Sequence, residues 1–597
     1  MFQSFDAPSG QADTGARIDA LRALMARDGL DAVLVPRADA HQGEYVADAD
    51  ARLRWLTGFS GSAGFAIVTA DRAGVFIDGR YRVQVLAETN PAIFTPVNWP
   101  ETAAAAWLRE MLPAGVVGFD PWLHTRAEIE ALESGLAGSG ITLRAIANPV
   151  DLIWTDRPAP PQGAARIHDA ALAGASAEDR RLRIAAALKA AGQGAAVLTL
   201  PDSIAWLLNI RGTDIPRNPV VLGFATLDDQ GRVGLYADPA KFSPELRAHL
   251  GNAVTLIAPE AFTPALALLQ GPVRLDPETA PEAVFRAIET ASVSIARDRD
   301  PVALPKAEKT AAELAGMRAA HLRDAVPMIR ALAWIAAQTP GSFTEIDVVR
   351  MLEAFRVEAG ATDISFDTIS GSGPNGAIVH YRVTKATNRS VQDGELLLLD
   401  SGGQYPDGTT DITRTLAIGT PPDAARDAYT RVLQGMIALS RLRFPRGLAG
   451  RDIEAVARAP LWWAGMDFDH GTGHGVGAAL CVHEGPLRIS RRSELPLAPG
   501  MIFSNEPGYY REGQWGIRIE NLIAVEPALS PDGRDMLGFE TLTLVPIEKT
   551  LIEPGMLSRA EIAWLDAYHA RIRAEIGPLV PDNARDWLDR ATAPLGD

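Results

Sequence analysis

Apolar residues near the start of the chain recur at the spacing of one helix face, and short apolar runs follow them. The helical positions are Ile18, Leu21, Leu24 and Met25. Runs at 32–35, 64–68 and 74–77 are bounded by turn residues and predict strands. This alternation continues to Trp154, and the proline-rich stretch 155–161 predicts a linker. We therefore expect an α/β domain over residues 1–157.

A second stretch repeats three landmarks of the first in the same order. Residues 32–36 resemble 196–201, 55–59 resemble 206–210, and the strand ending at Asp78 resembles the one ending at Asp238. One such similarity has little meaning, but three in one order predict a duplicated α/β domain. We place the second copy at 158–303.

The pattern changes again in residues 304–597, which we expect to form a third, α+β domain. An alanine-, glutamate- and leucine-rich segment from about 305 to 338 predicts a long helix. After residue 363, strand-like runs and glycine-rich turns dominate. Most of the candidate chemistry lies between there and Glu520.

Composition narrows the classes of function. A net charge of −17 disfavours nucleic acid and anionic membranes as partners, because both require a basic face. The single cysteine, Cys481, lies among apolar residues and is interpreted as a small buried side chain. No secretory signal is visible, and the apolar runs are shorter than the roughly 20 residues of a membrane span. We expect a cytoplasmic protein.

Two aspartates flank a predicted β-hairpin. Residues 395–400 read as a buried strand ending at Asp400, and Pro406-Asp407-Gly408 is a strong turn signal before a returning strand at 409–415. Asp400 and Asp411 are equidistant from the junction of residues 405 and 406. We therefore expect them to face each other on one side of the hairpin. Two buried carboxylates so close together require cations or a shared proton.

Three further segments supply ligand-type side chains. His474 lies among four glycines in 471–477, which allow the backbone to approach closely and clear space around the imidazole. Glu506 lies at a turn after a strand-like run. Strict alternation in 516–521 places Arg518 and Glu520 on one face.

Together these residues form a set of four carboxylates and one imidazole: Asp400, Asp411, His474, Glu506 and Glu520. Two divalent ions neutralise about four negative charges, and one does not. Oxygen ligands with one imidazole suit Mn²⁺, Co²⁺, Fe²⁺ or Zn²⁺. Two such ions, about 3.5–4 Å apart, are able to hold a bridging hydroxide and stabilise the oxyanion that its attack creates.

In combination, the motifs of this chain resemble the Xaa-Pro aminopeptidases of the long, three-domain type. The motifs are His380-Tyr381, 399–405, 407–415, 471–477, 482–486, 505–510 and 516–521, together with 58–64, 153–158 and Trp587-Leu588. The resemblance therefore runs nearly end to end. It implies two creatinase-like N-terminal α/β domains followed by a C-terminal pita-bread catalytic domain.

The resemblance also implies a function. It implies a homodimer with two divalent metal ions, usually Mn²⁺ with Zn²⁺ or Co²⁺ as alternatives, acting on peptides with proline at position two. A bridging hydroxide is the implied nucleophile, and Glu506 the ligand that also acts as general base. His380 and His483 are the implied catalytic and substrate-binding histidines. His470 and Arg518 are the implied further pocket residues, although His470 also fits a pair with Asp469 or a backbone group.

Alternative functions share part of this pattern. Prolidase-type dipeptidases and methionine aminopeptidases carry the same ligands, but they have fewer residues before the catalytic domain. A non-enzymatic binding module of the same fold is disfavoured because all five ligands are present. Residues 371–376 match a dinucleotide-binding GxGxxG literally, but Pro374 and a strand-like run at 377–379 do not fit the required turn into a helix. We interpret this segment as a loop before His380.

Overall fold

The computed structural model describes residues 2–6 and 13–595 and separates into two compact units. One unit comprises residues 8–306, and the other comprises residues 1–7 and 307–597. Among the described residues, no helix combines the length and apolar character that crossing a membrane requires.

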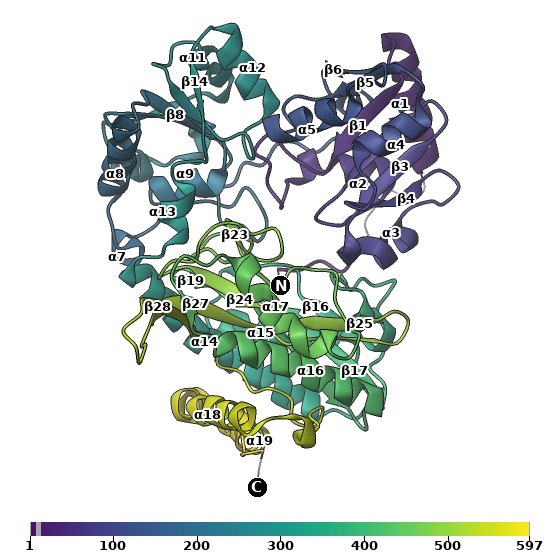
Figure 1. Ribbon diagram of the computed structural model, residues 1–597, viewed down its shortest axis with the longest axis vertical. Coiled ribbons are helices and arrows are strands. Elements are labelled where there is room, and N and C mark those ends of the chain that lie inside the picture. Colours follow the sequence, from purple (N-terminus) through teal and green to yellow (C-terminus); the bar gives the residue numbers. More distant parts are fainter. Residues whose placement is uncertain (1, 7–12, 596–597) are drawn as a thin grey trace. The chain divides into compact units, whose positions relative to one another are not determined.

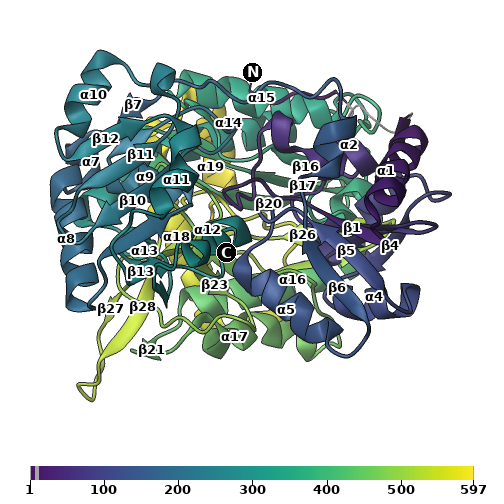
Figure 2. The same ribbon diagram turned by 90° about the horizontal axis from the view of Figure 1, so that it is seen from above.

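The unit of residues 8–306 contains the same open sheet twice, and Figures 1 and 2 show each sheet with helices of its own. The first sheet has the order β4-β3-β2-β1-β5-β6 and the second the order β12-β11-β10-β8-β13-β14. Strands of the first are β1 (Ala32–Pro36), β2 (Phe65–Thr69), β3 (Ala73–Ile77), β4 (Thr95–Asn98), β5 (Gly115–Phe119) and β6 (Ile141–Ala145). Strands of the second are β8 (Ala195–Leu198), β10 (Phe224–Asp228), β11 (Val233–Tyr236), β12 (Val254–Ile257), β13 (Val273–Leu275) and β14 (Ile295–Arg297). The shared order confirms the duplicated α/β fold.

Apart from the additional short helix α7 (Ala170–Ala173), the helices of the two copies also correspond in chain order. The first copy has α1 (Thr14–Asp28), α2 (Arg52–Thr57), α3 (Arg82–Glu88), α4 (Ala104–Met111), α5 (Arg126–Leu136) and α6 (Pro149–Ile153). The second has α7 (Ala170–Ala173), α8 (Ala177–Ala190), α9 (Pro201–Leu207), α10 (Pro244–Leu250), α11 (Phe262–Leu266), α12 (Glu282–Thr290) and α13 (Ala303–Ala307), with the small strands β7 (Arg166–Ile167) and β9 (Ile210–Arg211). Asp78 and Asp238, which the sequence pairs, each cap a 3-10 turn with the side chain.

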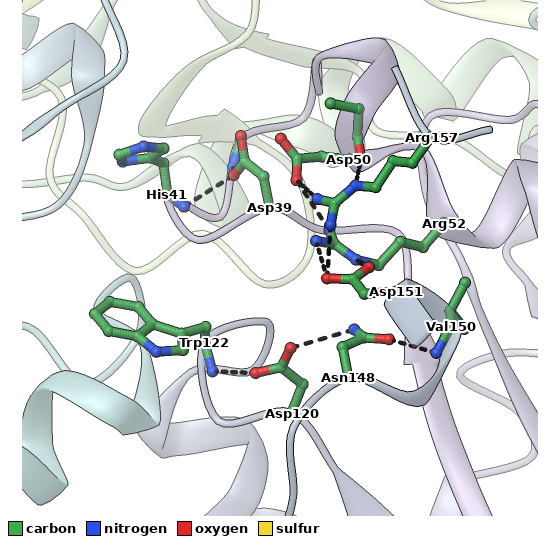
Figure 3. Close-up of polar contacts among 12 residues, drawn as sticks. Asp39, His41, Asp50, Arg52, Asp120, Trp122, Asn148, Val150, Asp151 and Arg157 are labelled. Carbon is green, nitrogen blue, oxygen red and sulfur yellow. Dashed lines mark hydrogen bonds and ion pairs between the residues drawn. The ribbon is translucent and has the colours of Figure 1, made fainter. Parts of the chain in front are cut away.

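Polar contacts at the carboxyl edge of each sheet repeat as well. In the first copy, Asp120 follows β5, accepts from the amide of Trp122 at 2.9 Å and accepts from Asn148 Nδ2 at 3.2 Å (Figure 3). Asn148 Oδ1 in turn accepts from the amide of Val150 at 3.0 Å. Asn148 therefore joins the loop after β5 to the start of α6.

In the second copy, Asp276 and Asp300 take the places of Asp120 and Asn148. Asp276 accepts from the amides of Glu278 and Asp300, each at 2.9 Å, and Asp300 accepts from the amide of Val302 at 2.8 Å. The architecture is the same, but a carboxyl group now occupies the position of an amide.

The other unit packs helices against curved antiparallel sheets. Its helices are α14 (Ala311–Ala336), α15 (Glu345–Glu358), α16 (Asp423–Ser440), α17 (Gly450–Trp462), α18 (Arg559–Glu575) and α19 (Asp582–Ala591). Its strands are β15 (Asp363–Ile364), β16 (Ile369–Ser372), β17 (Glu395–Ser401), β18 (Gly403–Tyr405), β19 (Gly408–Thr409), β20 (Ile412–Ile418), β21 (Phe444–Pro445), β22 (Gly473–Gly475), β23 (Glu484–Ile489), β24 (Ile502–Asn505), β25 (Gly508–Arg511), β26 (Trp515–Arg518), β27 (Asn521–Ala528) and β28 (Met536–Thr541).

Its largest sheet has the order β21-β28-β27-β24-β22-β23, and β17 lies between β16 and β20 in a second sheet. One apolar core joins Leu332 of α14, Leu352 of α15 and Val432 of α16 to Leu397 and Leu399 of β17. Figure 1 shows these helices alongside the strands. Burying one face of each element fixes the strand ends, and the candidate site is built from those ends.

Candidate metal centre

The hairpin of β17 and β20 places Asp400 and Asp411 on one face, although not directly opposite each other. Tyr405 pairs with Gly408, so the turn is Pro406-Asp407, and Asp400 lies opposite Thr413. The centre of the turn lies between residues 406 and 407, one position later than predicted. The prediction that Asp400 and Asp411 are equidistant from the turn is therefore wrong. The side they share is unaffected, because a shift of two residues along a strand preserves the face.

The turn closes where it does because α14 receives it. A Cβ atom on Gly316 would lie 2.4 Å from the carbonyl oxygen of Asp407, so only glycine leaves room for the turn. Arg323 of the same helix holds the Asp407 carboxylate through two hydrogen bonds of 2.8 and 2.9 Å. Helix packing thus sets the register that carries Asp400.

His474 enters the site on β22, between two glycines. A Cβ on Gly473 would lie 2.0 Å from Ser504 O, and one on Gly475 would lie 2.3 Å from Glu484 O. The motif therefore permits close backbone approach on both sides of the histidine. His474 Nε2 lies 3.5 Å from Asp411 Oδ2 and 3.5 Å from Glu506 Oε1.

The remaining carboxylates come from the ends of neighbouring strands. Glu506 follows β24, and Ser504 Oγ donates to its Oε1 at 3.2 Å. Glu520 lies between β26 and β27 and accepts from Thr413 Oγ1 at 2.8 Å. One potential ligand atom from each of Asp411, His474 and Glu520 lies within 4.8 Å of the others. The structure thus brings all five predicted ligand residues to one place through these contacts and the Arg518 contacts below.

The electrostatics of this cluster are unfavourable without cations. Burial and then the neighbouring Asp400 carboxylate raise the pKa of Asp411 well above its usual range. Burial and the charges of Asp411 and Glu506 do the same to the pKa of Glu520. Burial also raises the pKa of Glu506, opposed by His474 and Arg518. Asp400 Oδ1 is buried without a hydrogen-bond partner among the described residues.

The tautomer of His474 also indicates that this cluster is suited to cations. Its Nδ1 lies 2.9 Å from the carbonyl oxygen of Gly475, which only accepts, so Nδ1 carries a proton. In the neutral imidazole, the lone pair of Nε2 then faces two carboxylates. Metal-binding histidines commonly have this arrangement, with the second nitrogen bonded to a carbonyl. The residues present fit divalent cations.

Arg518 links three parts of the cluster. Its Nη2 donates to Asp400 Oδ2 at 2.6 Å, its Nη1 to Tyr510 Oη at 2.6 Å, and its Nε to Thr413 Oγ1 at 3.2 Å. Since Thr413 donates to Glu520, one guanidinium orients two carboxylates from distant segments of the chain. Both Arg518 and Asp400 are almost fully buried.

Tyr510 extends this network to His470. His470 Nε2 lies 2.9 Å from Tyr510 Oη, and His470 Nδ1 lies 2.8 Å from the carbonyl oxygen of Gly471. His470 therefore contacts a backbone group, as one interpretation of its sequence position expected, and it also joins the Arg518 network. Tyr510 lies in one of the motifs quoted above, but the sequence assigned it no role.

His483 lies beside His474, with ring centroids 4.3 Å apart in an edge-to-face arrangement. The next residue, Glu484, forms an ion pair with Lys309, and both side chains are 1% exposed. Sequence reasoning missed Lys309, because nothing in a lone lysine at the start of a helix indicates a distant buried partner. The pair fixes the start of β23 directly after His483.

His380 is half-buried in the turn after the 3-10 helix of residues Gly373–Ala377. The predicted strand at 377–379 is wrong, because the 3-10 helix and a turn occupy it. A Cβ on Gly516 would lie 1.8 Å from Gly376 O, so the GxGxxG segment is packed against β26. It leads into no α-helix, consistent with the interpretation as a loop. Cys481 is buried, as predicted.

Comparisons with known proteins identify the family. Sequence profiles match the creatinase/prolidase N-terminal domain at 17–153 and again at 156–313, metallopeptidase family M24 at 315–527, and the C-terminal region of peptidase M24 at 535–595. Aminopeptidase P2 of Arabidopsis thaliana is 38% identical, covering 97% of this chain and 88% of that protein. The chain belongs to the Xaa-Pro aminopeptidases of metallopeptidase family M24. It is therefore a hydrolytic enzyme.

Three further comparisons refine this finding. A probable Xaa-Pro aminopeptidase P of Aspergillus fumigatus is 39% identical, covering 98% of this chain and 93% of that protein. The crystal structure of X-prolyl aminopeptidase from Caenorhabditis elegans, described as a cytosolic enzyme with a di-nuclear active site, has a TM-score of 0.93 at 32% identity and covers 98% of this chain and 100% of that chain. A Xaa-Pro dipeptidase of Bacillus anthracis, with a TM-score of 0.51 at 26% identity, covers 62% of this chain and 99% of its own. The full-length similarity favours the aminopeptidases over the dipeptidases.

Proposed function

We propose that this enzyme removes the N-terminal residue from peptides with proline in second position, using two divalent metal ions held by Asp400, Asp411, His474, Glu506 and Glu520. The observation that carries the proposal is the convergence of His474 Nε2 with two carboxylate oxygens at 3.5 Å each. Such a cluster is unfavourable without cations, and the full-length relatives bear the name Xaa-Pro aminopeptidase.

Bound metal ions supply Lewis acidity and an activated water for hydrolysis. Within the chain, Glu506 is suited to move the proton. Its side chain is 18% exposed, against 4% for Asp411, so it is the carboxylate of this pair that a substrate reaches more readily. We assign Glu506 as the base that takes a proton from the attacking water and delivers it to the departing prolyl nitrogen.

The other residues bind and orient. We assign the free amine of the substrate to one metal ion and Asp411, which would restrict cleavage to the chain end. His483, edge-to-face against His474, and His380 are assigned to the scissile carbonyl and the proton transfers. Arg518 fixes the Asp400 carboxylate and is joined to His470 through Tyr510, and we assign Arg518 and His470 as the further pocket residues.

The proposal includes finer points. Mn²⁺ is the proposed metal, with Zn²⁺ or Co²⁺ as alternatives, since oxygen donors with one imidazole suit all three. A homodimer and a cytoplasmic location are also proposed, the latter by analogy with the cytosolic relative. The proposed domains are 1–157, 158–303 and 304–597.

The decisive experiment compares hydrolysis of Arg-Pro-Pro and Ala-Pro by the chelated and the Mn²⁺-reconstituted enzyme. We expect Mn²⁺-dependent release of arginine from the tripeptide and little cleavage of the dipeptide. Glu506→Gln should lower turnover by far more than tenfold, that is by more than about 1.4 kcal/mol of barrier. Glu512→Gln, the same change at an exposed glutamate in the turn after β25, is the control. Preference for Ala-Pro would favour a dipeptidase, and full activity of Glu506→Gln would exclude the assigned base.

A further inference from the structure

A buried histidine behind the metal centre carries one nitrogen that no protein group satisfies. His321 lies in α14 and is 3% exposed. Its Nδ1 lies 2.7 Å from the carbonyl oxygen of Met317, one helical turn earlier. Because a carbonyl oxygen only accepts hydrogen bonds, Nδ1 must carry a proton.

The other ring nitrogen is therefore an acceptor. Burial lowers the pKa of His321, so the imidazole is neutral and Nε2 presents a bare lone pair. Among the described residues, no donor lies within hydrogen-bonding distance of Nε2. Leaving a buried acceptor unsatisfied is costly, which makes a small hydrogen-bond donor the expected partner.

A cavity of about 10 Å³ lies next to His321, and its lining includes Thr410, Asp411, Ile412 and Thr543. One water molecule needs about 10–15 Å³ on this scale. Thr543 Oγ1 accepts from the amide of Leu522 at 2.8 Å, which leaves its hydroxyl hydrogen available to donate. The cavity thus has the size of a single water and offers it polar groups from His321 and Thr543, although its lining also includes the apolar Ala325, Ile412, Leu544 and Val545.

A competing acceptor in the lining is already occupied. Both oxygens of Asp324 accept from Arg356, at 2.9 and 3.0 Å. Tyr405 and Thr410 donate to the same carboxylate at 2.7 and 2.9 Å. A water in the cavity that donates one hydrogen to His321 has a second hydrogen to offer, and residues 410–412 are among the groups that line the cavity.

We propose that His321 is a positioning residue that holds the Asp411 segment in place through one bound water molecule. Thr410 and Asp411 lie between β19 and β20 and belong to neither strand, and the water would add to the direct hydrogen bond by which Thr410 already joins Asp324 of α14. Tying this segment to α14 fixes the carboxylate that the proposed metal site uses. This inference rests on the proposed function only for its consequence in metal binding.

Two substitutions distinguish the roles of the two ring nitrogens of His321. In His321→Asn, the side-chain amide takes the place of Nδ1 and still donates to Met317, but nothing replaces Nε2. In His321→Gln, the amide oxygen reaches the place of Nε2 and still accepts from the water. His569→Asn is the matched control, because His569 is equally buried, has a pKa lowered to about 3 mainly by burial, and accepts from the Ile547 amide through Nε2 in the C-terminal region.

The first measurement is amide hydrogen exchange over residues 408–416 in the metal-free, full-length protein. We expect faster exchange in His321→Asn than in His321→Gln, with His569→Asn unchanged there. The second is Mn²⁺ affinity, which should fall about tenfold or more in His321→Asn and much less in His321→Gln. Equal exchange in the two His321 variants would overturn the proposal.

A third measurement needs no variant. A high-resolution crystal structure of the unmodified protein should show a water within hydrogen-bonding distance of His321 Nε2, and its absence would also overturn the proposal. The exchange result does not depend on catalysis. If the exchange pattern holds but no Xaa-Pro peptide is cleaved, the proposed function fails and the role of His321 stands.

Discussion

Replacing Asp300 by asparagine should stabilise the protein at neutral pH, because the fold treats this aspartate as if it were an amide. Asn148, its counterpart in the first α/β copy, donates to Asp120 through Nδ2. Asp300 occupies the same position and is 5% exposed; its Oδ1 accepts from the Val302 amide, and the buried Ser203 hydroxyl is a side-chain donor beside its carboxyl group. Only a protonated carboxyl group reproduces the donor that Asn148 supplies.

The charged groups around Asp300 determine the size of the effect. Burial, with Asp202 and Asp276 opposing ionisation further, raises the pKa of Asp300 from 3.8 to about 6. Asp202 is itself paired with Lys306 at 2.7 Å. At about 1.4 kcal/mol for each pKa unit, a change from 3.8 to about 6 corresponds to about 3 kcal/mol.

The sign follows from proton linkage. A carboxyl group whose pKa is raised in the fold contributes stability that is fully present below pH 3.8 and is lost as the pH rises through about 6. An asparagine side chain does not titrate, so the Asp300→Asn variant would lack this dependence. We therefore compare the free energies of unfolding of Asp300→Asn and the unmodified protein. The excess stability of the variant should be small near pH 4, rise as the pH increases from about 4 to about 7, and level off near about 3 kcal/mol above about pH 7.

Urea unfolding and hydrogen exchange over β13 and β14, measured across this pH range, would test the expectation. Asp298→Asn is the control, since Asp298 is 54% exposed and pairs with Arg274 at 3.0 Å. A surface pair of this kind contributes about 1 kcal/mol or less. A difference for Asp300→Asn that does not vary with pH, or a loss of stability at pH 7, would refute the reasoning.

Three further predictions concern the catalytic unit. Lys309→Met removes the countercharge of the buried Glu484 and should lower the free energy of unfolding, measured by urea denaturation, by about 3–5 kcal/mol. Adding Glu484→Gln should restore much of that stability. A double variant no more stable than Lys309→Met alone would contradict this expectation. Tyr510→Phe removes the hydroxyl between Arg518 and His470 and should lower kcat/KM about tenfold or more, with Tyr509→Phe as the control. Equal kcat/KM values for the two variants would argue against a functional role of the Arg518–Tyr510–His470 network. Chelation should lower the Tm, and the metal-free protein should gain stability as the pH falls through the raised pKa values of Asp411 and Glu520. A metal-loaded sample showing the same pH dependence would contradict the assignment.

Residue types and short-range patterns determined many of the helices and strands of this protein and part of its candidate site. Helical and strand spacing predicted α1, β1 and β3, and three repeated landmarks predicted two sheets that prove to share one strand order. The alternation around Arg518 and Glu520 predicted their common face. These features are local, since backbone period and turn chemistry depend on neighbours within a few residues.

Tertiary packing decided what depends on long-range contacts. Gly316 and Arg323 of α14 set the turn at Pro406-Asp407, and this moved Asp411 away from the position opposite Asp400. The contact of Arg518 with Asp400 spans 118 residues and that of Lys309 with Glu484 spans 175. No spacing rule reaches across such distances, because a side chain finds its partner only after helices and sheets have packed.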